Sequence, residues 1–154
     1  MTQSTQALLS SVNLSINKIR GAYTAWAKAN GVNYHELLLL YFMLDHPQCT
    51  QKQVCELYLL PKQTINNVVI RLKDAGYLNL LPDADHQREK LLELTAAGQQ
   101  YAGNILTPLL TVEERILCRI GEEGIRQMAD TAGRYGALLA VEMTGDAVDE
   151  TRGK

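Results

Sequence analysis

Hydrophobic residues recur every three or four positions near the start of the chain, the spacing of one face of an α-helix. The repeat consists of Leu8, Val12, Ile16, Ile19, Tyr23 and Trp26. It predicts an amphipathic helix over residues 5–29, which Asn30 and Gly31 end because both tolerate the left-handed backbone of a helix terminus. A second helix is predicted over about 34–46, where nearly every side chain is apolar; such a helix is expected to be buried at the centre of a domain.

The stretch from Thr50 to Gly98 has the most specific pattern. Thr50 with Gln53 three residues later forms a capping box, which opens a short helix ending near Tyr58. Pro61 then suits the start of a second helix, since its φ angle is already helical and it has no N–H to leave unpaired.

This second helix has two distinct faces. Its apolar residues fall within a sector of about 100° and are expected to contact the core: Ile65, Val68, Val69 and Leu72. The opposite side carries Gln63, Asn66, Asn67, Ile70 and Asp74, with Arg71 beside it. Gly76 is predicted as the C-cap.

Two strands over 77–81 and 90–94 follow, joined by a polar hairpin tip. Thr95 is expected to cap a helix running toward Leu110, and Thr111 to cap a last helix whose apolar stripe reaches Met143. The order of elements predicts a mainly α fold with a small β-wing, a winged helix-turn-helix whose second helix fits the major groove of DNA.

The polar face of the second helix carries side chains that read bases, since Asn and Gln pair with adenine and Arg with guanine. The predicted major-groove residues are Gln63, Thr64, Asn66, Asn67 and Arg71, and the predicted phosphate ligands are Thr50, Gln51 and Lys62. The alternative is an ordinary solvated helix face. DNA is favoured because the face carries amides rather than a Glu/Lys mixture, and because Ile70 within it suits a thymine methyl group.

The wing offers a second contact with DNA. Arg88 and Lys90 flank a hairpin long enough to reach the minor groove, where a narrow groove concentrates negative potential. The alternative is that Arg88 is an ordinary hairpin charge paired with Asp83 or Asp85.

The charge of the chain does not by itself indicate that the protein binds DNA. The chain has a formal net charge of −2, and residues 50–95 contain six basic and six acidic residues, whereas binding phosphates needs positive charge. A winged helix that binds protein and never contacts DNA is therefore the alternative function.

Other classes of protein are disfavoured. No nucleophile elbow, phosphate-binding loop, dinucleotide fingerprint or zincin motif is present, so we expect neither an enzyme nor a cofactor. Cys49, Cys55 and Cys118 lack metal-binding spacing and are expected to be reduced structural thiols, with no metal bound. The longest apolar run has eight residues, against about 20 for a membrane span. With no signal-peptide pattern at the N-terminus, a cytoplasmic protein is expected.

A small-ligand site is predicted where the first two helices meet. Tyr23, Trp26, Tyr34, His35 and Met43 gather there, and pockets for small ligands are mostly apolar with a few polar groups. Arg20 or protonated His35 would bind an acidic ligand. The alternative is that Tyr23 and Trp26 are core anchors.

Residues 59–98, LLPKQTINNVVIRLKDAGYLNLLPDADHQREKLLELTAAG, resemble the MarR family of bacterial winged-helix regulators, and the likeness extends over nearly the whole chain. The family motifs are Leu72, Gly76 and Tyr77 before the wing and Leu94, Thr95 and Gly98 after it. The resemblance implies a homodimer that binds double-stranded DNA at pseudo-palindromic operators. It also implies a repressor that a small ligand, often an aromatic acid, releases from DNA.

Two departures from the family pattern stand out. Arg88 occupies the family's wing position, but His86 stands where the family has an Asp that orients the wing. No Cys precedes Cys49, so the peroxide-sensing mechanism of the family's redox branch is disfavoured.

We expect a single domain over 1–154. Its DNA-binding lobe would span 34–98, and its dimerisation helices 5–29 and 99–143. The DNA-binding lobe is too small to bury the apolar faces of two long amphipathic helices at opposite ends of the chain. We therefore expect these faces to pack against a second copy of the chain.

Overall fold

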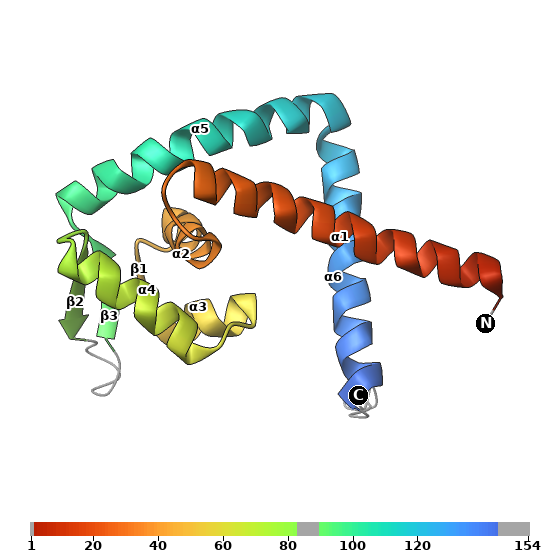
Figure 1. Ribbon diagram of the computed structural model, residues 1–154, viewed down its shortest axis with the longest axis horizontal. Coiled ribbons are helices and arrows are strands. Elements are labelled where there is room, and N and C mark those ends of the chain that lie inside the picture. Colours follow the sequence, from red (N-terminus) through yellow and green to blue (C-terminus); the bar gives the residue numbers. More distant parts are fainter. Residues whose placement is uncertain (1, 83–89, 145–154) are drawn as a thin grey trace, which may run out of the picture. The chain divides into compact units, whose positions relative to one another are not determined.

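The computed structural model describes residues 2–82 and 90–144. Along the chain lie α1 (Gln3–Ala29), α2 (Tyr34–Asp45), β1 (Gln48–Thr50), α3 (Gln51–Tyr58), α4 (Lys62–Asp74), β2 (Leu78–Pro82), β3 (Lys90–Leu94), α5 (Ala96–Ile120) and α6 (Glu122–Thr144) (Figure 1). Contacts divide the chain into two compact units, an N-terminal unit, Met1–Thr107, and a C-terminal unit, Pro108–Lys154. The mainly α, winged helix-turn-helix fold predicted from the sequence is confirmed.

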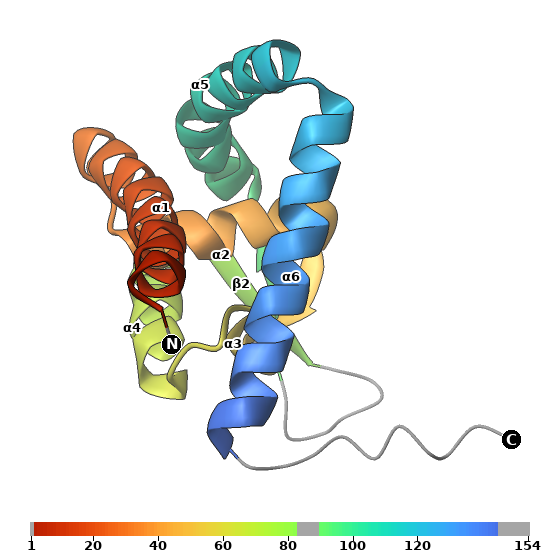
Figure 2. The same cartoon turned by 90° about the vertical axis from the view of Figure 1, so that its right-hand side faces the viewer.

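The core of the N-terminal unit is built around α2. This helix packs against both α1 and α4, and Leu37, Leu39 and Leu40 are fully buried in it. In both views α3, α4 and the strands lie below α2, and the end of α1 and the start of α5 lie above it (Figures 1 and 2). The apolar stripe of α4 is buried as predicted, so the opposite side of α4 is exposed.

The wing sheet contains one strand that the pattern did not predict. Its strand order is β1-β3-β2, and the unpredicted β1 pairs antiparallel with β3 through Gln48, Cys49 and Thr50. A strand of three residues is too short to show an alternating pattern, and Thr50 also caps α3. The two predicted strands are present, with Leu78 and Leu92 buried.

The predicted division between the last two helices is wrong. Helix α5 continues from Ala96 to Ile120 through both Pro108 and Thr111, and α6 begins only at Glu122. The break falls at Gly121, whose φ of 85° is left-handed and unfavourable for other residues.

The end of α4 has the geometry of a Schellman motif. The Tyr77 N–H donates to the Leu72 carbonyl at 2.9 Å, and the Gly76 N–H donates to the Lys73 carbonyl at 2.9 Å. Gly76 takes the left-handed φ of 76° that this motif requires, one residue after the C-cap Ala75.

The start of α5 is fastened to this same turn. The Thr95 hydroxyl donates to the Gly76 carbonyl at 2.8 Å and accepts the Gly98 N–H at 3.0 Å. The Thr95 N–H donates to the Tyr77 carbonyl at 3.0 Å. Gly98 is buried against that carbonyl, and a Cβ at this position would lie 1.9 Å from the Tyr77 oxygen. We call this arrangement of Gly76, Tyr77, Thr95 and Gly98 the wing base.

In the C-terminal unit no residue of α6 is buried. Large apolar side chains stay exposed along both of its helices, namely Ile116, Leu117, Ile120, Met128, Leu138, Leu139 and Met143. Within the described part of the chain, every helix is too short or too polar to cross a bilayer.

The wing base generates a stability prediction. Gly98→Ala should lower the free energy of unfolding by about 1–3 kcal/mol, because the new methyl group overlaps a backbone carbonyl that cannot move without breaking the wing base. Urea denaturation at fixed protein concentration measures the change.

Gly103→Ala in the same helix is the matched control. A Cβ at Gly103 meets nothing within 4 Å, so this change should raise the free energy of unfolding by about 0.5–1 kcal/mol. Equal effects of the two substitutions would contradict the argument.

Candidate nucleic-acid interface

The exposed side of α4 carries the predicted base-reading residues. Gln63, Asn67 and Ile70 are exposed, whereas Thr64 and Asn66 are half-buried. All five come from one helix whose opposite stripe is fixed in the core. The burial of that stripe therefore leaves the side chains of Gln63, Asn67 and Ile70 on the outer side of the helix.

Two amides on this face are hydrogen-bonded to each other. The Gln63 Nε2 donates to the Asn67 Oδ1 at 2.8 Å, across one turn of the helix. The bond leaves the Asn67 Nδ2 as a donor and the Gln63 Oε1 as an acceptor. Adenine presents an acceptor and a donor to the major groove, so the pair is chemically suited to that base.

The N-terminus of α4 has no side-chain cap. Pro61 is the N-cap residue and accepts only through its carbonyl, from the Thr64 N–H at 3.0 Å. Free backbone N–H groups and the helix dipole favour an anion at such an end, and the exposed Lys62 adds a charge beside it.

Thr50, which was predicted to bind phosphate, forms hydrogen bonds within the protein instead. Its side chain accepts the Gln53 N–H at 3.2 Å, the Gln53 Oε1 accepts the Thr50 N–H at 2.8 Å, and Thr50 itself is buried. The predicted capping box is thus confirmed. The neighbouring Gln51 is half-buried.

Arg71 is paired with a carboxylate inside the protein. Its guanidinium forms an ion pair with Glu36 of α2, whose side chain has 0% exposure, while the Arg71 side chain is 48% exposed. Glu36 also accepts a hydrogen bond from the Tyr101 hydroxyl of α5 at 2.7 Å. This network was not predicted. It pairs the Arg71 guanidinium, which the sequence analysis assigned to the major groove of DNA, with a carboxylate of the protein itself.

The wing contributes one described candidate. Lys90 is exposed at the start of β3, opposite Pro82 of β2. Arg88 and the departure at His86 lie outside the described residues, as do Asp83 and Asp85.

Pairing reduces the free positive charge of the lobe. Lys52 lies 4.0 Å from Glu56, and Arg71 is paired with Glu36. Among the residues that the structure describes, Lys62, Lys73 and Lys90 have no ion pair.

Only some of the residues predicted to form a small-ligand site contact one another. The Arg20 guanidinium lies 5.6 Å from the centre of the Tyr34 ring, and Tyr34 meets His35 edge-on at 5.9 Å. Met43 is buried, and the Trp26 Nε1 is buried without a hydrogen-bond partner in the described residues.

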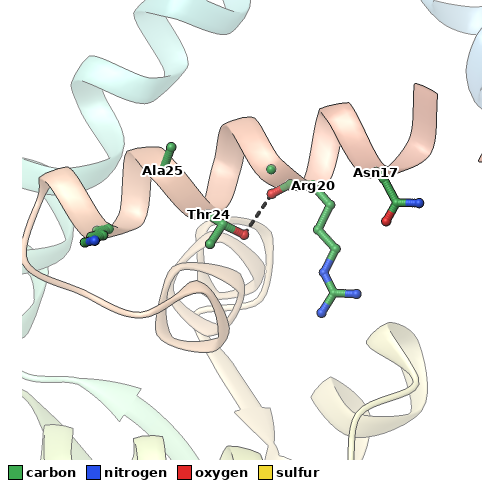
Figure 3. Close-up of a pocket in the computed structure, with 6 residues that line it drawn as sticks. Asn17, Arg20, Thr24 and Ala25 are labelled. Atoms are coloured by element: carbon green, nitrogen blue, oxygen red, sulfur yellow. Dashed lines mark hydrogen bonds between the residues drawn. The ribbon is translucent and has the colours of Figure 1, made fainter. Parts of the chain in front are cut away.

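A hollow of about 420 Å³ lies on α1, and Arg20 is its one member from the predicted set (Figure 3). It is lined by Asn17, Arg20, Gly21, Thr24, Ala25 and Lys28, all from this helix. Arg20 and Asn17 extend from the same side of the helix (Figure 3). One helix cannot enclose a ligand, so a complete site here needs a second wall.

The cysteines are free thiols, as predicted. Burial raises the pKa of Cys49 to about 11 and also raises the pKa of Cys55. At neutral pH these two thiols are therefore protonated and poorly reactive. The described residues contain no group of three or more His, Cys, Asp or Glu that could hold a metal ion.

Comparisons with known proteins agree with this fold. A model of the MarR family matches residues 30–89, a range that begins directly after α1 and ends directly before β3. No curated protein matches the chain.

Several solved structures are similar. NMB1585, a MarR family regulator from Neisseria meningitidis, is 22% identical with a TM-score of 0.81, over 95% of this chain and 99% of that one. The transcriptional regulator BldR from Sulfolobus solfataricus is 16% identical with a TM-score of 0.70, over 86% and 99%. NadR, solved in complex with 4-hydroxyphenylacetate, is 16% identical with a TM-score of 0.70, over 80% and 91%. At these identities the likeness establishes the fold.

Proposed function

We propose that this protein is a transcriptional regulator of the MarR family that binds double-stranded DNA at specific operators in the cytoplasm, and the match of a MarR family model to residues 30–89 supports this. The observation that carries the proposal is the exposed polar face of α4, where Gln63 and Asn67 are oriented by their mutual hydrogen bond. That face lies opposite a buried stripe, so it is free to enter a major groove.

Within this proposal the residues have different roles. Gln63, Asn67 and Asn66 read base edges, and Ile70 contacts a thymine methyl group. Lys62 and the uncapped start of α4 bind phosphate, with Thr64, Gln51 and Lys90 beside them. The buried Thr50 contributes by capping α3, and Arg88 remains the proposed minor-groove residue.

The first prediction separates base reading from phosphate binding. On a specific operator, Asn67→Ala should weaken binding by about 1–3 kcal/mol and leave binding to random DNA nearly unchanged. Lys62→Ala should weaken binding to both and reduce the dependence of affinity on salt, since one phosphate contact is lost. Fluorescence anisotropy with DNA from the gene's own upstream region measures both.

Lys18→Ala on α1 is the control for loss of a charge, and it should change neither quantity. If Asn67→Ala and Lys62→Ala behaved alike on specific and random DNA, the division of roles would be wrong. If the wild-type protein bound no DNA while capturing a protein partner, the alternative of a protein-binding winged helix would replace the proposal.

We further propose that the protein is a homodimer joined through α1 and the C-terminal helices. The support is apolar surface without a partner in either unit. On α1 the exposed apolar side chains of Leu8, Leu9, Ile16 and Ile19 lie within about 100° of one another around the helix axis. A two-fold dimer also matches the symmetry of a pseudo-palindromic operator.

Sedimentation tests the dimer. The wild-type protein should sediment as a dimer at micromolar concentration, and Ile16→Glu should dissociate it because a charge enters the apolar stripe. Ser10→Glu, about 120° away around the helix axis, should leave the dimer intact. A wild-type monomer would contradict the proposal.

A small acidic aromatic ligand is proposed to release the DNA. The support is the cation of Arg20 over Tyr34, together with the indole N–H of Trp26 in the same helix as Arg20, which has no hydrogen-bond partner among the described residues. Tyr23, His35 and Met43 complete the proposed surroundings. NadR was solved with such an acid, which makes 4-hydroxyphenylacetate a suitable first probe. To act, the ligand must bind better to the dimer arrangement that does not fit the operator.

Titration with 4-hydroxyphenylacetate should change the fluorescence of Trp26, the only Trp, and lower operator affinity with the same midpoint. Arg20→Ala should weaken both responses together, whereas Lys18→Ala should not. Loss of operator affinity without a change at Trp26 would place the site elsewhere.

A further inference from the structure

The buried carboxylate of Glu36 joins three helices of the N-terminal unit. It belongs to the first turn of α2, forms an ion pair with Arg71 of α4, and accepts the Tyr101 hydroxyl of α5 at 2.7 Å. With 0% exposure it has no direct access to solvent or to DNA. Its effects must therefore pass through the groups that it holds.

Glu36 does not perform the usual task of a first-turn acid. Such a residue commonly caps its own helix by reaching back to the N-cap backbone. Here Asn33 makes the cap, accepting the Glu36 N–H at 2.9 Å. The Glu36 side chain instead lies inside the protein, where the positive end of the α2 dipole also favours its charge.

The network closes on the wing base. The ring of Tyr101 stacks on that of Tyr77, with centres 4.3 Å apart and planes 13° apart. Tyr77 directly follows the turn that ends α4, and its carbonyl accepts the Thr95 N–H. The last turns of α4 are thus held twice, through Arg71 to Glu36 and through Tyr77 to Tyr101.

A buried charge that loses its partner has a high cost in free energy. The conformation in which Arg71 is paired with Glu36 is therefore strongly preferred over conformations in which the two are apart. Arg71 lies on the flank of the α4 polar face, one residue after Ile70. Any rotation or shift of α4 that moved Asn67 would also pull Arg71 away from Glu36. The network consequently opposes such movements.

We propose that Glu36 is a positioning residue for operator recognition: through Arg71 and Tyr101 it sets the placement of α4 on the lobe, and Arg71 serves this role rather than reading a base. This inference rests on the proposed DNA-binding function. It predicts that loss of the network relaxes recognition of the whole half-site, because α4 moves as one body.

The test compares Glu36→Gln, Arg71→Met and the double variant on the specific operator and on random DNA, well below each unfolding temperature. Each single change should lower the ratio of specific to random affinity by about tenfold. The double variant should lose about as much as either single variant, because both break one interaction. Asn67→Ala, which removes a direct reader, should cost less in the Glu36→Gln background than in the wild-type protein, because the displaced α4 has already weakened the contact that Asn67 makes.

The base-pair profile separates the two roles of Arg71. With single base-pair changes in the operator, Arg71→Met should reduce discrimination across the half-site, whereas loss of a base reader affects one position. Discrimination lost at one base pair only, or a Glu36→Gln variant with wild-type specificity, would overturn the inference while leaving DNA binding intact. A role in stability alone would lower specific and random binding equally. If the wild-type protein prefers no sequence, the proposed function itself fails.

Discussion

The close contact between the start of α5 and the Tyr77 carbonyl determines how α4, β2 and β3 are assembled in the N-terminal unit. Thr95 and Gly98 bring the two ends of the wing together, since β2 follows Tyr77 and β3 ends just before Thr95. Only glycine allows this approach at position 98. The same contact fixes the end of α4, so α4 and the wing share one anchor.

Local signals in the sequence predicted most of this lobe. The capping box at Thr50, the glycine after α4 and the apolar stripe each depend on residues a few positions apart, and each is found in the structure. The prediction was wrong where a local signal competes with its surroundings. Thr111 with Glu114 is a local signal for a helix start, yet α5 continues past both residues and ends at Ile120, before Gly121. The short β1 depends on pairing with β3, whose partner residues lie 41 to 45 positions later in the chain, and no local pattern indicates such a pairing.

In the candidate nucleic-acid interface, too, local patterns predicted some features and missed those that depend on contacts between distant residues. Periodicity placed Gln63 and Asn67 on the exposed side of α4 because the opposite stripe belongs to the same helix. It could not identify Glu36 as the partner of Arg71, since the two are 35 positions apart in the sequence. One signal was present: Glu36 is a lone acid among the apolar residues that open α2, and a buried charge requires a partner. Any Arg or Tyr elsewhere in the chain could have been that partner, and the sequence alone does not indicate which one.

The ion pair with Glu36 also affects how a lobe of balanced charge would bind DNA under the proposed function. Pairing leaves Lys62, Lys73 and Lys90 as the unpaired basic residues of the described part of the lobe, so under the proposed function this part would offer few phosphate contacts. Affinity from charge is then modest for a single lobe, and two lobes acting together become important because linked contacts multiply. A dimer whose recognition helices are fixed by internal networks would bind tightly only where both half-sites fit. In such a protein, weak electrostatic attraction favours specificity, because random DNA satisfies too few contacts to compete.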